Sequence, residues 1–189
     1  MLEFELKIGG PFNWIGENTI FHPPQNELSG LYFHSLFINN VYVIEYIGIT
    51  SRKYSKRFIE HTQEFLSGGY QIFDNIDAEK RNVLWHGRFG KQKEKDISKF
   101  FEKFDKLSPV ILAQLNSYKI FTILIEDKRI SERVEGAIYK ILYNSSIAKV
   151  KKYIDQGIRY KSKRDNEDII KIKLYPENIF LGLPNVFEV

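Results

Sequence analysis

The sequence contains no cysteine. Disulfide bonds, zinc fingers and a cysteine nucleophile are therefore excluded, and the composition fits a reducing compartment or simple avoidance of cysteine. The chain also lacks an uncharged apolar run long enough to cross a bilayer, and its first residues do not form a basic stretch followed by an apolar one. We therefore expect a soluble, cytoplasmic protein with no membrane partner.

The charge of the chain is distributed unevenly. The 189 residues are 43% hydrophobic, enough for one domain with a sizeable core, and carry a net charge of +4. Residues 80–95 hold six Lys and Arg against one Glu, residues 149–164 hold seven against one Asp, and the remainder is acidic. This pattern is expected for a protein that contacts a phosphate backbone. The alternative is that both stretches are solvated surface segments.

The sequence predicts three strands in the regions 30–49 and 118–126. Two β-branched and aromatic runs, one starting at Gly30 and one over 41–49, flank the turn-forming pair Asn39-Asn40, so they predict a β-hairpin. Residues 118–126 are almost continuously apolar, as in a central strand covered on both faces.

A helix is expected over 52–66, capped by Thr50 or Ser51. Within it, Arg57 and His61 lie four residues apart and therefore project from one face. One turn of helix thus places a permanent cation beside a titratable ring.

A second helix is expected over 131–143, with Ser131 as its cap. Its apolar positions form one face, and Glu135 lies beside that face. Glu132, one turn earlier, is the competing candidate for a functional carboxylate.

The rest of the chain is interpreted more coarsely. Trp14 and His22 are taken as structural residues. The apolar stripe of the helix over 97–107 is taken as core or dimer contact, and Pro109 separates it from a helix over 110–115. We further expect an edge strand over 2–8, a short strand over 70–73, a helix over 147–155, a last strand over 169–174, and a tail that packs back through Ile179, Phe180 and Phe187. The fold class is α+β, with a small mixed or antiparallel sheet flanked by helices.

These residues resemble the GIY-YIG nucleases, which hydrolyse DNA phosphodiester bonds with one divalent metal. Tyr32 stands where the tyrosine of the first motif would be, and Tyr46, fourteen residues later, where that of the second would be. Arg57 follows eleven residues after Tyr46, His61 occupies the family's Tyr-or-His position, and Glu135 fits the metal-binding glutamate.

The resemblance covers 29–66 and 118–144. We expect a single domain of residues 1–189. Relative to the family, residues 67–117 would be an insertion before the third core strand, and residues 145–189 would be a basic C-terminal extension.

The resemblance implies the role of each motif residue. Glu135 would hold one Mg²⁺ or Mn²⁺, Arg57 would contact a phosphate oxygen, and Tyr46 would orient the water or bind the scissile phosphate. Tyr32 is the expected general base. A free phenol has a pKa of about 10, so roughly one in a thousand is ionised at neutral pH. Arg57, the metal or His61 must therefore lower that pKa or relay the proton, and His61 is an alternative final acceptor.

Several cations are expected to contact double-stranded DNA. The mixed aromatic and basic composition of 85–91 suits a loop or strand turn that enters a groove, and the segment lacks the spacing of a phosphate loop. Asn144 is either a phosphate contact or a helix C-cap. The candidate DNA-binding residues are Arg52, Lys53, Lys56, Arg88, Lys91, Lys93, Asn144, Lys151, Lys152, Lys161, Lys163 and Arg164.

We therefore expect a metal-dependent DNA endonuclease of the restriction type. A single site cuts one strand, so cleavage of both strands predicts a homodimer, with 97–115 as the candidate contact. The first alternative is a nucleic-acid-binding module that keeps the fold without cleaving. The second is an unrelated α+β enzyme in which the tyrosines are core residues.

Overall fold

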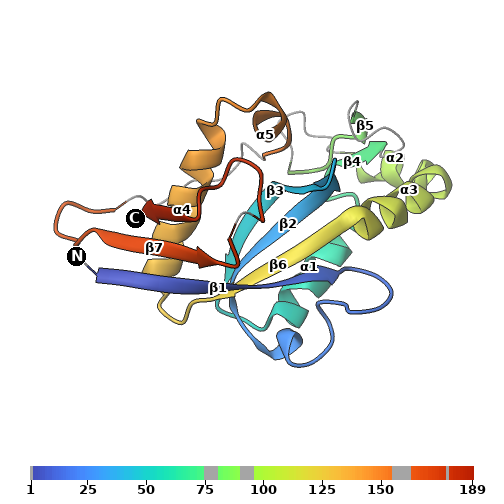
Figure 1. Ribbon diagram of the computed structural model, residues 1–189. Coiled ribbons are helices and arrows are strands. Elements are labelled where there is room, and N and C mark those ends of the chain that lie inside the picture. Colours follow the sequence, from blue (N-terminus) through green and yellow to red (C-terminus); the bar gives the residue numbers. More distant parts are fainter. Residues whose placement is uncertain (1, 75–80, 90–95, 155–162, 178) are drawn as a thin grey trace.

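The computed structural model describes residues 2–74, 81–89, 96–154, 163–177 and 179–189. Within these ranges the chain forms a six-stranded mixed sheet, a two-stranded sheet, five α-helices and one 3₁₀ turn (Figure 1). The strands are β1 (Leu2–Asn13), β2 (Gly30–Ile38), β3 (Val41–Thr50), β4 (Ile72–Asp74), β5 (Asn82–Trp85), β6 (Tyr118–Leu124), β7 (Ile170–Tyr175) and β8 (Val186–Glu188). The helices are η1 (Gln25–Glu27), α1 (Tyr54–Leu66), α2 (Ile97–Glu102), α3 (Phe104–Ser117), α4 (Lys128–Tyr143) and α5 (Ala148–Tyr153). The expected α+β class is confirmed, with a larger sheet than expected.

The predicted hairpin forms the centre of one half of the large sheet. Its turn, Asn39-Asn40, has φ values of 52° and 62°, the left-handed pair that a two-residue hairpin turn requires and that asparagine tolerates. On its other side β2 pairs antiparallel with β6, so the order in this half is β3-β2-β6. β2 and β6 are therefore interior strands, as the apolar run over 118–126 predicts, and β3 is the edge.

The expectation that 2–8 is an edge strand is wrong. β1 pairs antiparallel with β6 and parallel with β7, and it continues through Gly9-Gly10-Pro11 to Asn13 with an irregular register. The alternating pattern arises because one face of the strand is buried, with Leu6 and Ile8 in the core. Alternation of apolar and polar residues indicates that one face of a strand is buried. It does not indicate whether the strand pairs with one other strand or with two.

Helices cover both faces of the β3-β2-β6 half of the sheet. Leu31 and Phe33 of β2 share a core with Val134 and Ile138 of α4. Tyr32, whose side chain points the other way along the strand, shares the second core with residues of α1 and α3. α1 and α4 therefore lie against opposite faces of the sheet (Figure 1).

Both helix starts differ from the sequence-based expectation. α1 begins at Tyr54, because the Thr50 hydroxyl accepts a hydrogen bond from the Arg52 amide at 3.0 Å and forms a turn before the helix. α4 is capped by Asp127, whose carboxylate accepts from the Ile130 amide at 2.8 Å.

The helical part of 67–117 is divided at Lys103, not at Pro109. Pro109 lies inside α3, where it removes one donor from the second turn without ending the helix. The expected apolar stripe is mainly core, since Phe100 and Leu107 are buried, whereas Phe101 is 62% exposed.

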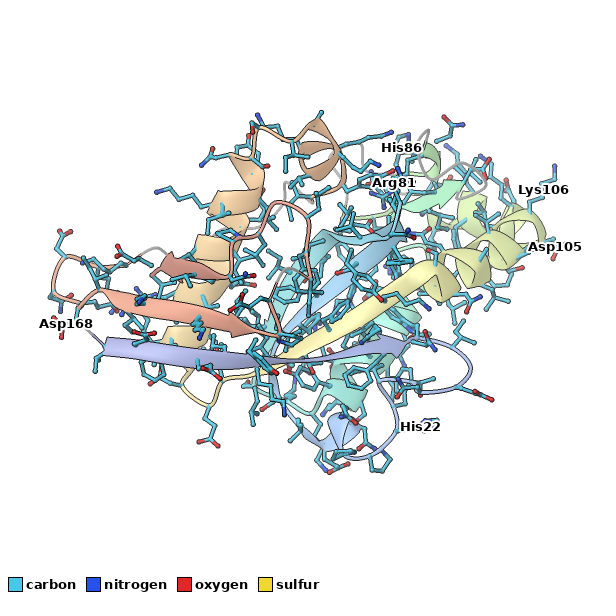
Figure 2. The ribbon with its side chains drawn as sticks, in the orientation of Figure 1. His22, Arg81, His86, Asp105, Lys106 and Asp168 are labelled. Atoms are coloured by element: carbon cyan, nitrogen blue, oxygen red, sulfur yellow. The ribbon has the colours of Figure 1, made fainter. Side chains whose placement is uncertain are left out.

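The strands β4 and β5 are attached to the large sheet through Arg81. Its guanidinium forms an ion pair with Glu45 of β3 and lies 3.8 Å from the centre of the Phe73 ring, and both charged side chains are largely buried. Arg81 is labelled in Figure 2 near the end of β2 and beside β4.

The C-terminal expectations are confirmed. α5 and β7 form close to 147–155 and 169–174, and the tail returns to the sheet, where Leu181 donates to the Tyr42 carbonyl at 2.9 Å. Phe180 and Phe187 are buried there, with Ile179 packed against them. Among the described residues, no helix has the length and apolar character needed to cross a membrane.

Candidate active site

Tyr32 is completely buried on the β2 strand, and its ring lies over Gly48 of β3. The two residues are direct partners in the hairpin register. A Cβ atom at position 48 would lie 2.5 Å from both Cζ and the hydroxyl oxygen of Tyr32, which is closer than such atoms approach. Gly48 therefore makes room for the Tyr32 ring.

Helix α1 brings Arg57 and His61 to the Tyr32 hydroxyl. His61 Nε2 lies 2.8 Å from this oxygen, and Arg57 Nε donates to it at 3.1 Å. The start of the helix is fixed because the Tyr54 hydroxyl donates to the Leu31 carbonyl at 2.9 Å, beside Gly30. Because Arg57 and His61 are four residues apart on the helix, both side chains contact the same Tyr32 hydroxyl group.

Two further tyrosines surround His61. Its Nδ1 atom lies 2.8 Å from the Tyr70 hydroxyl, so both ring nitrogens have phenol partners. The Tyr46 ring centre is 5.8 Å from that of His61 and 6.1 Å from that of Tyr32. Tyr32, Tyr46, Arg57, His61 and Tyr70 form one cluster of side chains. Trp14 is buried beside it and donates its indole N–H to Thr62 at 2.9 Å, which confirms its structural role.

Burial determines the protonation of the cluster. It raises the pKa of Tyr32 well above its ordinary value, and Tyr46 raises it further, while Arg57 opposes the shift. Burial, assisted by His34 and Arg57, lowers the pKa of His61 to about 2. At neutral pH the free protein therefore has a protonated Tyr32 and an uncharged His61. The pKa of Tyr32 is therefore not lowered in this state, contrary to one of the two routes that the sequence left open.

His34 belongs to the same cluster, although the sequence analysis did not select it. It is 5% exposed, its Nε2 atom has no hydrogen-bond partner, and its ring centre lies 5.0 Å from that of Tyr46 and 5.2 Å from that of His61. Burial lowers its pKa to about 3. The sequence could have predicted this position, because His34 lies two residues after Tyr32 and therefore on the same face of the strand.

Glu60 is a second residue that the sequence analysis missed. Its carboxylate accepts from Arg57 Nη1 at 3.2 Å and from both terminal nitrogens of Arg52 at 2.5 and 2.8 Å. It stands three residues after Arg57, a spacing at which helical side chains meet. The carboxylate is therefore paired with both Arg52 and Arg57, the two arginines of α1 and its approach that were expected to contact DNA.

Other expected DNA contacts also have carboxylate partners. Lys53 pairs with Glu27, and Arg88 lies 3.3 Å from Glu64. Exposed pairs of this kind contribute only about 0–1 kcal/mol, so a phosphate can compete for these cations.

The remaining candidate contacts come from several elements. Lys56, Lys151, Lys152 and Arg164 are exposed, and Asn144 is the C-cap of α4. Lys163 donates to two backbone carbonyls. The candidates Lys91, Lys93 and Lys161 lie outside the described residues.

Trp85 ends strand β5, as one of the two interpretations of 85–91 allowed, but it does not enter a groove. Its side chain is buried in β5 and donates to the Gly68 carbonyl at 2.9 Å, so it is not available for stacking on a base. Phe89 is 62% exposed. His22, labelled in Figure 2, lies on the exposed loop between β1 and β2.

Glu135 lies on α4, which packs against the face of the sheet opposite to the Tyr32 ring. Its side chain is partly exposed, whereas Glu132 is buried and lies 3.6 Å from Arg129. Among the described residues, no group of three or more His, Asp or Glu side chains is arranged to hold a metal ion. A single partly exposed carboxylate fits Mg²⁺, which keeps several water ligands and is often bound by one or two carboxylates.

The arrangement therefore unites four of the five expected catalytic residues, Tyr32, Tyr46, Arg57 and His61, in one cluster. Glu135 comes from the other side of the sheet. Comparisons with protein-family models, with curated proteins and with solved structures found no match to this chain.

Proposed function

We propose that the protein is a metal-dependent nuclease that hydrolyses phosphodiester bonds in DNA. The observation that carries this proposal is the Tyr32 hydroxyl, which is held between the Arg57 guanidinium and the neutral ring of His61. Phosphodiester hydrolysis needs a proton acceptor for the attacking water next to a cation for the phosphate. Arg57, which is partly exposed, supplies the cation, and Tyr32, which is buried in the free protein, would supply the acceptor once DNA and water reach its hydroxyl.

The proton movements follow from the two hydrogen bonds. As water attacks phosphorus, its proton would pass to the Tyr32 oxygen while the phenol proton passes to His61 Nε2, 2.8 Å away. The bond between phosphorus and the departing 3′ oxygen then breaks. Arg57 would neutralise charge on a non-bridging oxygen, because a guanidinium stays protonated at all relevant pH values. Glu135 would hold the metal, which would supply positive charge for the DNA backbone.

The test is cleavage of plasmid and mixed genomic DNA, read on a gel with Mg²⁺ or with EDTA. Wild type, Glu135→Ala and Tyr32→Phe are compared, with Glu5→Ala on the exposed face of β1 as a control. Loss of a positioned acid or base typically reduces the rate by about 10²–10⁴, so we expect Tyr32→Phe to fall in this range and Glu135→Ala to lose its metal-dependent activity. Discrete fragments would indicate a site-specific enzyme. Equal cleavage by wild type and Tyr32→Phe would refute the mechanism.

A second candidate is a nucleic-acid-binding module that does not cleave. It is favoured by the position of Glu135 on a helix across the sheet from Tyr32. Salt-sensitive binding of duplex DNA, unchanged by metal and without cleavage of duplex, single-stranded, flap or RNA substrates, would support this function instead.

A further inference from the structure

The segment after α1 returns along the helix and places Tyr70 on His61. Gly68, with φ of +72°, ends the helix in the left-handed conformation, and the amides of Gly69 and Tyr70 both donate to the Glu64 carbonyl. The Tyr70 ring then packs on Phe65, with ring centres 5.0 Å apart. The Tyr70 hydroxyl is thereby fixed 2.8 Å from His61 Nδ1.

Three hydrogen bonds form a continuous path from Arg57 to Tyr70. Arg57 can only donate, so the Tyr32 oxygen accepts from it. When the Tyr32 hydroxyl donates to His61 Nε2, the single proton of the neutral ring must sit on Nδ1, which then donates to the Tyr70 oxygen. Tyr70 retains its own hydroxyl proton for a further partner.

A relay through His61 needs an exit because the ring itself has no access to water. His61 is 1% exposed, whereas Tyr70 is partly exposed. The titratable groups that face the ring are Tyr32 and His34 from β2, Tyr46 from β3, and Arg57 from its own helix, in addition to Tyr70. Burial strongly disfavours a charged imidazole in this place, so a proton is not stored on the ring.

We infer that Tyr70, a residue outside the nuclease motifs, is the exit of a proton relay that runs from Tyr32 through His61 to the protein surface. The inference rests on the proposed nuclease function. In one turnover the Tyr32 proton moves to His61 Nε2, the Nδ1 proton moves to the Tyr70 oxygen, and the Tyr70 proton moves to solvent water. Each group loses one proton and gains one, with Tyr32 gaining that of the attacking water, so the ring need not remain charged. The ring is left with its proton on Nε2, and a shift of the tautomer back to Nδ1 precedes the next turnover.

The first test is independent of cleavage and uses the ¹⁵N-labelled full chain. Long-range ¹H–¹⁵N spectra report which ring nitrogen is protonated, and the chain has only four histidines, so a His61→Gln spectrum assigns the signal. We expect His61 to be protonated on Nδ1 in the wild type. In Tyr70→Phe, which keeps the ring packing on Phe65, the Nε2-protonated form should increase. Protonation of Nε2 in the wild type would overturn the relay, whatever the protein cleaves.

The second test uses DNA cleavage. We expect Tyr70→Phe to lower kcat by at least about tenfold with little change in KM, and to change the solvent deuterium isotope effect on kcat, because a relay step is lost. Tyr175→Phe, at the exposed end of β7, is the matched control and should behave as wild type. If the wild type cleaves and Tyr70→Phe retains its kcat and isotope effect, the relay is wrong while the nuclease function stands. If the wild type cleaves nothing, the nuclease proposal fails, and the ¹⁵N spectra still decide the hydrogen-bond path.

Discussion

The two buried histidines of the candidate site should make the fold sensitive to acid. His34 and His61 remain neutral in the native state, because burial lowers their pKa values to about 3 and about 2. In the unfolded chain a histidine has a pKa of about 6.5. Between these values the unfolded state binds more protons than the native state, so stability falls as pH decreases from about 6.5.

The magnitude follows from the width of this pH window. One pH unit between the two pKa values corresponds to about 1.36 kcal/mol for one group. At pH 4.5, two units below the pKa of the unfolded chain, each histidine lowers the free energy of unfolding by about 2.7 kcal/mol relative to pH 7.5. The two histidines together lower it by about 5 kcal/mol. Such a loss is a large part of the 5–15 kcal/mol that is typical of a domain.

Urea unfolding followed by tryptophan fluorescence at pH 7.5 and 4.5 measures this loss. In His34→Phe, which fills the same aromatic site, the difference between the two pH values should shrink by about 2.7 kcal/mol. Phe58→Leu, in the same cluster, should lower stability equally at both pH values. If His34→Phe retained the full pH dependence of the wild type, the proposed neutral state of the buried ring would be refuted.

Two substitutions test the other contacts of the site. Gly48→Ala places a methyl group 2.5 Å from the Tyr32 hydroxyl, so we expect a loss of about 1–3 kcal/mol in unfolding free energy together with reduced cleavage; an unchanged urea midpoint would contradict the close contact. Glu60→Gln removes the carboxylate that pairs with Arg52 and Arg57. An exposed pair contributes about 0.2–1 kcal/mol, so we expect a roughly 1.4- to fivefold gain in affinity for labelled duplex DNA, measured by anisotropy without metal and with Glu5→Gln as control. Weaker binding by Glu60→Gln would show that Glu60 instead holds the arginines in position.

Local patterns in the sequence were sufficient for the elements that depend on neighbouring residues. The Asn39-Asn40 turn, the helix with Arg57 and His61 on one face, and the buried strand over 118–126 all follow from spacing or from a residue's own backbone preference. Such features are decided within a few residues, so a single sequence contains them.

The tertiary structure alone decided which distant segments meet. The sequence did not show that β1 lies between β6 and β7, because strand pairing over a long separation depends on the whole core and not on a local pattern. It also did not show that the chain after α1 brings Tyr70 back to His61, or that Glu60 is shared by Arg52 and Arg57. The candidate residues could be selected from the sequence, whereas their protonation could not be predicted, because burial by side chains of several elements sets the pKa values of Tyr32 and His61.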